Sequence, residues 1–342
     1  MAQNILGIDL GGTKVFAAVF DDTGAILGKG RNKTEAERGD TTVFETIVST
    51  GMDAIASAGL GVSDIAAVGI GSPGPLDYET GYIIDTPHLS FKDFPLGPRL
   101  SEAFGCPAFI DNDVNVAVYA EQKLGAARDA SVVVGLWIGT GIGGGIVIHG
   151  ELHHGYSKNA GELGHMVVRA GGPRCNCGAR GCVEALGSRT GMARQIKKAL
   201  REGKKTVFQK HQKKLAHLSS GDLREAYEGG DKVVIKVVHR AARYIGIATG
   251  SLINIIGPDV IVFGGGVIEA MSDIMLPEIQ KWAGRVAFEY SMRGVRFVKA
   301  ELGDDAGIVG ASIIARERLT AQEGRPAEHQ PGAAKQADTT MY

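Results

Sequence analysis

The stretch Asn4–Phe20, NILGIDLGGTKVFAAVF, contains two apolar runs separated by the turn-forming residues of DLGGTK. Each run has the length and the residue types of a buried β-strand. A second turn, Asp21–Gly24 (DDTG), leads into a further run, Ala25–Gly30. Because Asp and Gly favour the tight turns of β-hairpins, the chain is predicted to begin with adjacent strands joined by short turns.

Outward from this start, strands and helices alternate along the chain. The first predicted elements are a helix at 41–58, a strand at Ile65–Ile70, a strand at Pro107–Ile110 and a helix at Val114–Lys123. A similar series follows, with strands at Val132–Ile138, Ile146–His149 and Val260–Phe263 and a long helix at Ala241–Ile256. This recurrence predicts two related α/β halves around a cleft.

The composition limits the possible functions. The 342 residues suffice for two domains, and a formal net charge of −1 gives no basic surplus for binding nucleic acid or an anionic membrane. The first residues lack the basic region of a signal peptide, so we expect a cytoplasmic protein with reduced thiols. The basic segment Lys197–Lys214 is interpreted as a solvated helix and loop, and the tail 320–342 is predicted to be disordered.

Many of the 50 glycines gather in short motifs. Two of these, DLGGTK and GTGIGGG (Gly139–Gly145), lie between predicted strands, where successive backbone N–H groups can bind phosphate oxygens. GTGIGGG matches the dinucleotide fingerprint only weakly, because a strand rather than a helix follows it. Taken singly, each motif is more often an ordinary tight turn. Together with Gly264–Gly266 they indicate nucleotide phosphates, with Thr13 as a further donor and Asp9 as a site for hydrated Mg²⁺.

Three polar residues, Asp111, Asn112 and Asp113, stand between a predicted strand and a predicted helix. One of them is expected to cap the helix, because Asp and Asn are favoured N-cap residues. Three exceed what one cap needs, and a carboxylate here is also suited to accept the proton of a sugar hydroxyl that attacks a γ-phosphate. From spacing alone, capping and catalysis are equally weighted.

Three of the four cysteines, Cys175, Cys177 and Cys182, stand close together, shortly after His165. A disulfide is disfavoured in a reducing compartment, and a redox pair calls for C-x-x-C at the start of a helix. The set instead suits a tetrahedral Cys₃His zinc site. Since four protein ligands leave no place for water, the zinc is predicted to be structural.

The motifs DLGGTK, GSPGP, DNDVN, GTGIGGG, GELGH and CNCGARGCVE, in this order, resemble those of the ROK family of sugar kinases. The resemblance extends from about Ile5 to about Ile314. It implies an α/β, actin-like and hexokinase-like (ribonuclease H-like) fold of two domains with a central cleft. We therefore expect a small domain at 1–120, completed by a C-terminal helix at about 305–319, and a large domain at 121–304 that carries the zinc-binding loop.

The resemblance also implies roles for individual residues, with Asp113 as the catalytic base. The expected sugar-binding residues are Gly74, Asn112, Asp113, Glu162, His165 and Glu184, and the expected zinc ligands are His165, Cys175, Cys177 and Cys182. The residues expected to contact ATP and Mg²⁺ are Asp9, Gly11, Gly12, Thr13, Lys14, Gly139, Thr140, Gly141, Gly143, Gly264, Gly265 and Gly266. Two matches have plainer alternatives: Lys14 as an exposed side chain and Glu184 as a charge at a helix N-terminus.

Among ROK proteins the motifs resemble glucokinases most, which implies transfer of the γ-phosphate of ATP to the 6-OH of glucose by a homodimer or homotetramer. The segment Thr86–Phe91 departs from the family pattern at the border of the sugar pocket. Kinases of N-acylhexosamines, mannose or fructose therefore remain alternatives, as does polyphosphate as the donor.

Two non-kinase classes are also open. ROK repressors carry an N-terminal helix-turn-helix, whereas DLGGTK begins at residue 9 here, so we expect a kinase rather than a non-catalytic sugar-sensing regulator. An actin-like chaperone would share the phosphate loops but would have no use for GELGH or for the cysteines.

Overall fold

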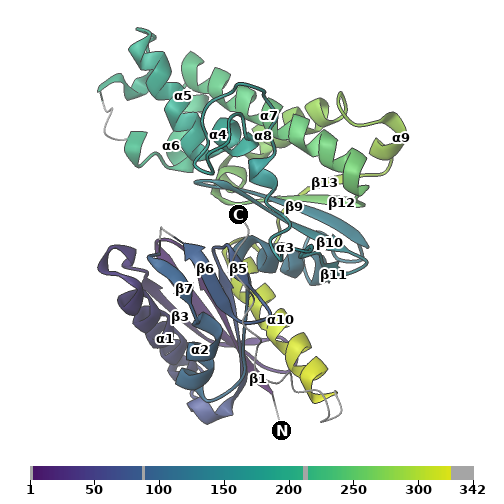
Figure 1. The fold of residues 1–342 in the computed structure, drawn as a ribbon. Coiled ribbons are helices and arrows are strands. Elements are labelled where there is room, and N and C mark those ends of the chain that lie inside the picture. The colour runs from purple at the N-terminus through teal and green to yellow at the C-terminus, as the bar shows by residue number, and fades with distance from the viewer. Residues whose placement is uncertain (1–2, 87–88, 211–214, 325–342) are drawn as a thin grey trace, which may run out of the picture.

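Two five-stranded sheets form the framework of the fold (Figure 1). The computed structural model describes residues 3–86, 89–210 and 215–324. The first sheet has the order β3-β2-β1-β4-β8, and its strands are β1 (Asn4–Leu10), β2 (Lys14–Phe20), β3 (Ile26–Lys33), β4 (Ile65–Ser72) and β8 (Ala108–Asn112). The first three strands are antiparallel neighbours, and β4 and β8 run parallel to β1. The stretch Asn4–Phe20 thus supplies two inner strands of this sheet, as predicted.

The second sheet repeats this pattern. Its order is β11-β10-β9-β12-β13, and its strands are β9 (Val132–Ile138), β10 (Ile142–Ile148), β11 (Glu151–Leu152), β12 (Val260–Gly264) and β13 (Arg296–Lys299). Here too, two antiparallel pairings precede two parallel ones. The two related α/β halves that the sequence predicts are therefore confirmed.

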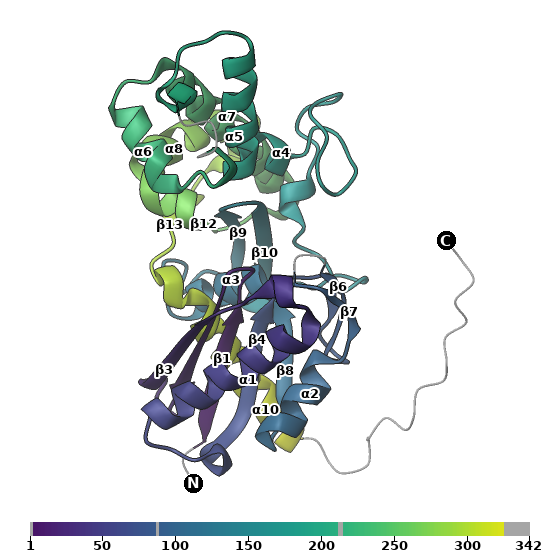
Figure 2. The same ribbon diagram turned by 90° about the vertical axis from the view of Figure 1, so that its left-hand side faces the viewer.

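Two helices cover opposite faces of the first sheet: α1 (Asp40–Ser57) and α10 (Ala306–Glu323), as Figures 1 and 2 show. Glycines permit the close approach of α10. A Cβ atom at Gly7 would lie 2.3 Å from the carbonyl oxygen of Ile308, and one at Gly69 would lie 1.9 Å from that of Ala311. The last helix of the chain therefore packs directly on its first strand.

The second sheet lies between two helical layers. Apolar side chains on one face form a core with α5 (Arg189–Arg201), α6 (Ser220–Glu228), α7 (Lys232–Ile256) and α8 (Gly266–Ala283). Val183 of the short helix α4 (Val183–Gly187) belongs to the same core, and Met292 of α9 (Glu289–Met292) packs against it. The other face packs on α3 (Asp113–Lys123) and on Ile314 of α10. The predicted domain boundary at residue 120 falls inside α3, whose buried side chains contact the second sheet. The boundary itself stays a prediction.

A small third sheet lies between β4 and β8 in the chain and was not expected from the sequence. It consists of β5 (Leu76–Asp77), β6 (Tyr82–Thr86) and β7 (Phe91–Phe94), and it leads into α2 (Leu96–Phe104). Its buried apolar side chains join the core of the first half. Two residues of the unusual segment Thr86–Phe91, at positions 87 and 88, lie outside the described residues.

The predicted start is wrong for one strand and for one helix of the second half. Strand β10 begins at Ile142 rather than at Ile146, so Gly143 belongs to the strand and not to a turn. The glycine is needed there because a Cβ atom would lie 2.5 Å from the side chain of Val114. Helix α7 begins at Lys232 rather than at residue 241, because the carboxylate of Asp231 accepts hydrogen bonds from the first free N–H groups of the helix.

The C-terminal helix is also longer than predicted. It continues to Glu323, so the first residues of the predicted disordered tail are helical, and positions 325–342 lie outside the described residues. Within the described ranges, no helix combines the length and the apolar character needed to cross a membrane.

Candidate active site

Polar residues at the end of β8 begin helix α3. The side-chain oxygen of Asn112 accepts hydrogen bonds from the N–H groups of Val114 (2.9 Å) and Asn115 (3.2 Å), so Asn112 is the N-cap. One oxygen of Asp113 also accepts from the Val114 N–H, at 2.9 Å. Because Asn112 already caps the helix, the carboxylate of Asp113 is not needed for that purpose.

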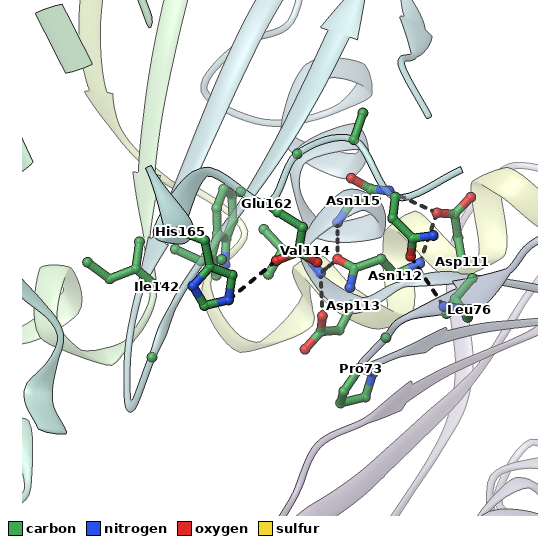
Figure 3. Close-up of a pocket in the computed structure, with 18 of the residues that line it drawn as sticks. Pro73, Leu76, Asp111, Asn112, Asp113, Val114, Asn115, Ile142, Glu162 and His165 are labelled. Atoms are coloured by element: carbon green, nitrogen blue, oxygen red, sulfur yellow. Dashed lines mark hydrogen bonds and ion pairs between the residues drawn. The ribbon is translucent and has the colours of Figure 1, made fainter. Parts of the chain in front are cut away.

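Two cavities of about 380 Å³ each meet at Asp113. The first, drawn in Figure 3, is lined by all six residues expected to bind sugar: Gly74, Asn112, Asp113, Glu162, His165 and Glu184. The second is lined by six residues of the expected phosphate site: Asp9, Gly11, Thr13, Lys14, Gly265 and Gly266. Since Asp113 lines both, a molecule in one cavity can meet a molecule in the other at this carboxylate.

The remaining predicted phosphate residues are dispersed. Gly139, Gly141 and Gly143 line the first cavity rather than the second. Thr140 lines a separate cavity of about 460 Å³, where the guanidinium of Arg189 donates to its hydroxyl at 2.6 Å. Gly12 and Gly264 line none of these cavities; Gly264 packs against the ring of Trp137, where a Cβ atom would lie 2.5 Å from a ring carbon. Trp137 itself lines both cavities at Asp113, and no motif had marked it.

Two carboxylates that line the second cavity, those of Asp113 and Asp9, have raised pKa values. Burial, reinforced by the negative charge of Glu162, raises the pKa of Asp113 to about 6. Burial also raises the pKa of Asp9 to about 7, and the charges of Asp113 and Asp304 add to the effect. Such a group of carboxylates is unfavourable unless a cation compensates it. Carboxylate oxygens beside phosphates are the usual ligands of Mg²⁺, so this donor set fits a magnesium ion in the second cavity.

The loop between β11 and α4 brings the four predicted metal ligands together. The ligand atoms of His165, Cys175, Cys177 and Cys182 all lie within 4.8 Å of one another. The Sγ atoms of Cys177 and Cys182 are 3.7 Å apart, and Sγ of Cys175 is 3.6 Å from Nδ1 of His165. Tetrahedral zinc with bonds of ~2.0–2.3 Å places its ligand atoms roughly 3.5–3.8 Å apart. The donor set therefore fits a structural zinc ion.

The metal cluster adjoins the first cavity through two side chains. While Nδ1 of His165 faces the cysteines, its Nε2 lies 3.8 Å from a carboxylate oxygen of Glu162, the dashed contact in Figure 3. One oxygen of Glu184 accepts from the Ile142 N–H at 3.0 Å, and the other lies 3.6 Å from Sγ of Cys175. Glu184 is thus more than a charge at the start of α4, because its carboxylate fixes the turn of the β9–β10 hairpin.

A buried carboxylate beneath this site carried no separate signal in the sequence. Asp111 is 1% exposed and accepts hydrogen bonds from Asn115 (3.1 Å), His154 (2.8 Å) and Arg318 (2.9 Å). Burial opposes its ionisation, but the hydrogen bonds and charges of His154 and Arg318 prevail and lower the pKa of Asp111. Since His154 follows β11 and Arg318 belongs to α10, three distant parts of the chain meet next to the N-cap Asn112.

The loop after β11 also reaches the small third sheet. The ammonium group of Lys158 lies 3.0 Å from a carboxylate oxygen of Asp77, and the side-chain oxygen of Asn159 accepts from the Leu76 N–H at 3.4 Å. Both Lys158 and Asn159 line the first cavity. The wall of this cavity is therefore built from both halves of the molecule.

Two α/β halves of one topology, with a carboxylate between two cavities, define an actin-like protein of two domains. A model of the ROK family matches residues 5–318. The glucokinase of Halalkalibacterium halodurans is 33% identical over 319 residues, which cover 93% of this chain and 96% of that protein. The glucokinase of Thermotoga maritima is 34% identical over 327 residues, covering 92% and 98%. The chain belongs to the ROK family.

Solved structures show the same architecture. A ROK hexokinase from Thermus thermophilus superposes with a TM-score of 0.78 at 33% identity and covers 93% of this chain and 100% of that one. A ROK glucokinase from Streptomyces griseus, in complex with glucose and AMPPNP, gives 0.78 at 29% identity, with coverage of 93% and 100%. A ROK transcriptional regulator, a homologue of the E. coli Mlc protein, gives 0.81 at 26% identity and covers 93% and 78%. The predicted actin-like, hexokinase-like fold is confirmed.

Proposed function

We propose that this protein is a glucokinase, an ATP-dependent hexokinase that transfers the γ-phosphate of ATP to the 6-OH of glucose. The observation that supports this most is the position of Asp113, which lines both cavities at their junction. A base at such a junction can accept a proton from a hydroxyl in the first cavity while that hydroxyl attacks a phosphate in the second. The glucose and AMPPNP in the S. griseus relative support this choice of substrates.

In this proposal the polar side chains of the first cavity hold the sugar. Asn112, Glu162 and Glu184 bind hydroxyl groups, and Nε2 of His165 binds another. Asp113, ionised above a pKa of about 6, accepts the proton of the 6-OH.

The second cavity would orient the donor. Thr13, Lys14 and the backbone N–H groups of the β1–β2 turn bind phosphate oxygens. Mg²⁺, when bound beside Asp9, would supply positive charge to the phosphates.

The zinc ion would act on structure rather than on chemistry, because His165 and the three cysteines would supply all four ligands and leave no position for water. Held by His165 and the cysteines, the loop would keep Glu162 and Glu184 in place around the sugar. We also propose a cytoplasmic location, which suits thiolate ligands, and assembly as a homodimer or homotetramer.

The nearest alternatives are kinases of N-acylhexosamines, mannose or fructose, with polyphosphate as a possible donor. A different class is a non-catalytic sugar-sensing regulator, and the structural similarity to the ROK transcriptional regulator supports this alternative. A regulator without catalysis would not need a base between two cavities. This chain has the carboxylate of Asp113 at that position, together with the expected sugar-binding and phosphate-binding residues that line the cavities.

A substrate panel tests the proposal. Initial rates with ATP and with polyphosphate would be measured for glucose, mannose, fructose, N-acetylglucosamine and N-acetylmannosamine. We expect the highest kcat/KM with glucose and ATP. A higher value for an N-acetylhexosamine would move the assignment to that kinase. Sugar binding without sugar-dependent ADP release would instead support the regulator.

A further inference from the structure

A cavity of about 570 Å³ is lined by residues of α5, of the segment that follows it and of α7. These two helices lie at the end of the molecule remote from the first sheet (Figures 1 and 2). The cavity shares no lining residue with the two cavities that meet at Asp113. Its volume falls in the range of small-molecule sites. Its base is aliphatic, formed by Ala199, Val233 and Val237. The catalytic proposal gives this cavity no role.

Basic side chains surround this cavity. They come from α5, from the segment that follows it and from α7, and they are Lys198, Lys204, Lys205, Lys232, Lys236 and Arg240. Among the described residues, Glu202 is the one acidic member of the lining. All seven of these charged residues are exposed. We call this set of cations the basic groove; for a chain with a net charge of −1 it is a marked local excess.

The cations on α7 conflict with helix stability. Lys232, Lys236 and Arg240 are spaced four residues apart, so they project from one face of the helix and repel one another. Lys232 also occupies the first position of α7, where the positive end of the helix dipole disfavours a cation. An anion bound between α5 and α7 would relieve both conflicts.

Neighbouring carboxylates leave most of this charge uncompensated. Glu202 lies 2.6 Å from the ammonium of Lys204 and 3.9 Å from that of Lys198. For Lys205, Lys232 and Lys236, no carboxylate of the described residues lies within ion-pair distance. In the described part of the lining, six cations therefore accompany one carboxylate.

We propose that the basic groove binds an anion that carries two or more phosphate groups. Lysine ammonium groups are strongly hydrated point charges that bind phosphate oxygens. Cations line both the α5 side and the α7 side, so an anion with several phosphate groups can engage both walls at once. Lys198, Lys204 and Lys205 of this site belong to the basic segment Lys197–Lys214, which is interpreted from the sequence as a solvated helix and loop. The proposal does not depend on the catalytic function.

Calorimetric titration of the full chain with sodium tripolyphosphate tests the site. The triple variant Lys232→Gln/Lys236→Gln/Arg240→Gln removes the α7 wall and, by relieving repulsion, should fold at least as stably. The double variant Lys204→Gln/Lys205→Gln removes cations of the opposite wall. A matched control, Lys92→Gln/Lys281→Gln/Arg296→Gln, removes three exposed cations that line none of the cavities described above.

We expect each groove variant to lose one binding event for tripolyphosphate or to bind it with a Kd about tenfold higher. The control should retain the wild-type isotherm. Inorganic phosphate should bind the wild type about tenfold more weakly than tripolyphosphate. Identical isotherms for the wild type and both groove variants would overturn the proposal, because tripolyphosphate would then bind only near Asp113 or nowhere. Equal affinity for inorganic phosphate would overturn the requirement for several phosphates.

Discussion

The carboxylate of Asp113 has to be ionised to accept a proton and basic enough to hold it. Burial and the charge of Glu162 raise its pKa to about 6, which is still below neutral pH. The group is therefore ionised near pH 7 but binds a proton more strongly than an exposed aspartate does. Its neighbour Asn112 caps α3, so the two residues divide the structural task and the proposed chemical task.

The first prediction concerns the pH dependence of catalysis. Because the ionised form of Asp113 is the active one, kcat/KM for glucose should fall about tenfold per pH unit below an apparent pKa near 6. Glu162→Gln removes a negative charge that raises this pKa, so the acid limb should move to lower pH. The KM for glucose should also increase.

The control for this measurement is Glu102→Gln, an exposed change on α2 that lines neither cavity at Asp113. Its profile should match that of the wild type. An acid limb that stays in place in Glu162→Gln would contradict the assigned cause of the raised pKa.

At the scale of elements, the loop between β11 and α4 joins the metal cluster to the sugar cavity. Its fold rests on few apolar contacts of its own, since Cys175, Cys182 and Ala185 form a separate small core. A bound metal ion would supply the missing constraint. Loss of the metal should therefore affect sugar binding before it affects the rest of the fold.

The second prediction compares two cysteines. Cys177→Ser removes an exposed ligand of the cluster, so zinc content should fall well below one ion per chain, and the KM for glucose should rise about tenfold or more. The KM for ATP should change far less. Cys106→Ser changes the cysteine outside the cluster and should leave both quantities unaltered. Normal glucose affinity in a zinc-free Cys177→Ser protein would disprove the link.

Local patterns in the sequence predict many of the individual helices, strands and loops. The junction of β8 and α3 and the cysteine cluster are set by residues close together in the chain, so spacing and residue type suffice. The third sheet was not predicted because β5 and β7 are very short, and their strand conformation depends on pairing with β6. The glycines of β10 were assigned to a turn because the contacts that require them come from other elements: Val114 at Gly143, Leu163 at Gly144 and Val118 at Gly145.

For the whole molecule, the two halves meet through α3, α10 and the loop after β11. Asp111 lies at this junction, and its partners His154 and Arg318 come from opposite sides of it. Arg318 also donates to the backbone oxygens of Tyr78 (3.2 Å) and Ile110 (3.1 Å). The contacts of Arg318 span more than 200 positions of sequence, and no local pattern predicts them.

The third prediction tests this junction. Arg318→Gln leaves the buried carboxylate of Asp111 without its guanidinium partner, so the free energy of unfolding should fall by about 3 kcal/mol. Because Asp111 precedes the Asn112–Asp113 pair, kcat should fall as well, while zinc content stays normal. Denaturant unfolding and steady-state kinetics measure both effects.

Arg293→Gln serves as the comparison, since it breaks an exposed ion pair with Glu289 that contributes little. An unchanged free energy of unfolding in Arg318→Gln would show that the junction does not depend on this contact.

The central claim is that Asp113 acts as the base in phosphoryl transfer to a sugar, and Asp113→Asn tests it most directly. Turnover of glucose and glucose binding would be measured on the same preparation, with binding followed by the fluorescence of Trp137, which lines both cavities, in a Trp282→Phe background. We predict that kcat falls by about 100-fold or more while the Kd for glucose changes only a few-fold. Near-normal turnover in Asp113→Asn would contradict the account.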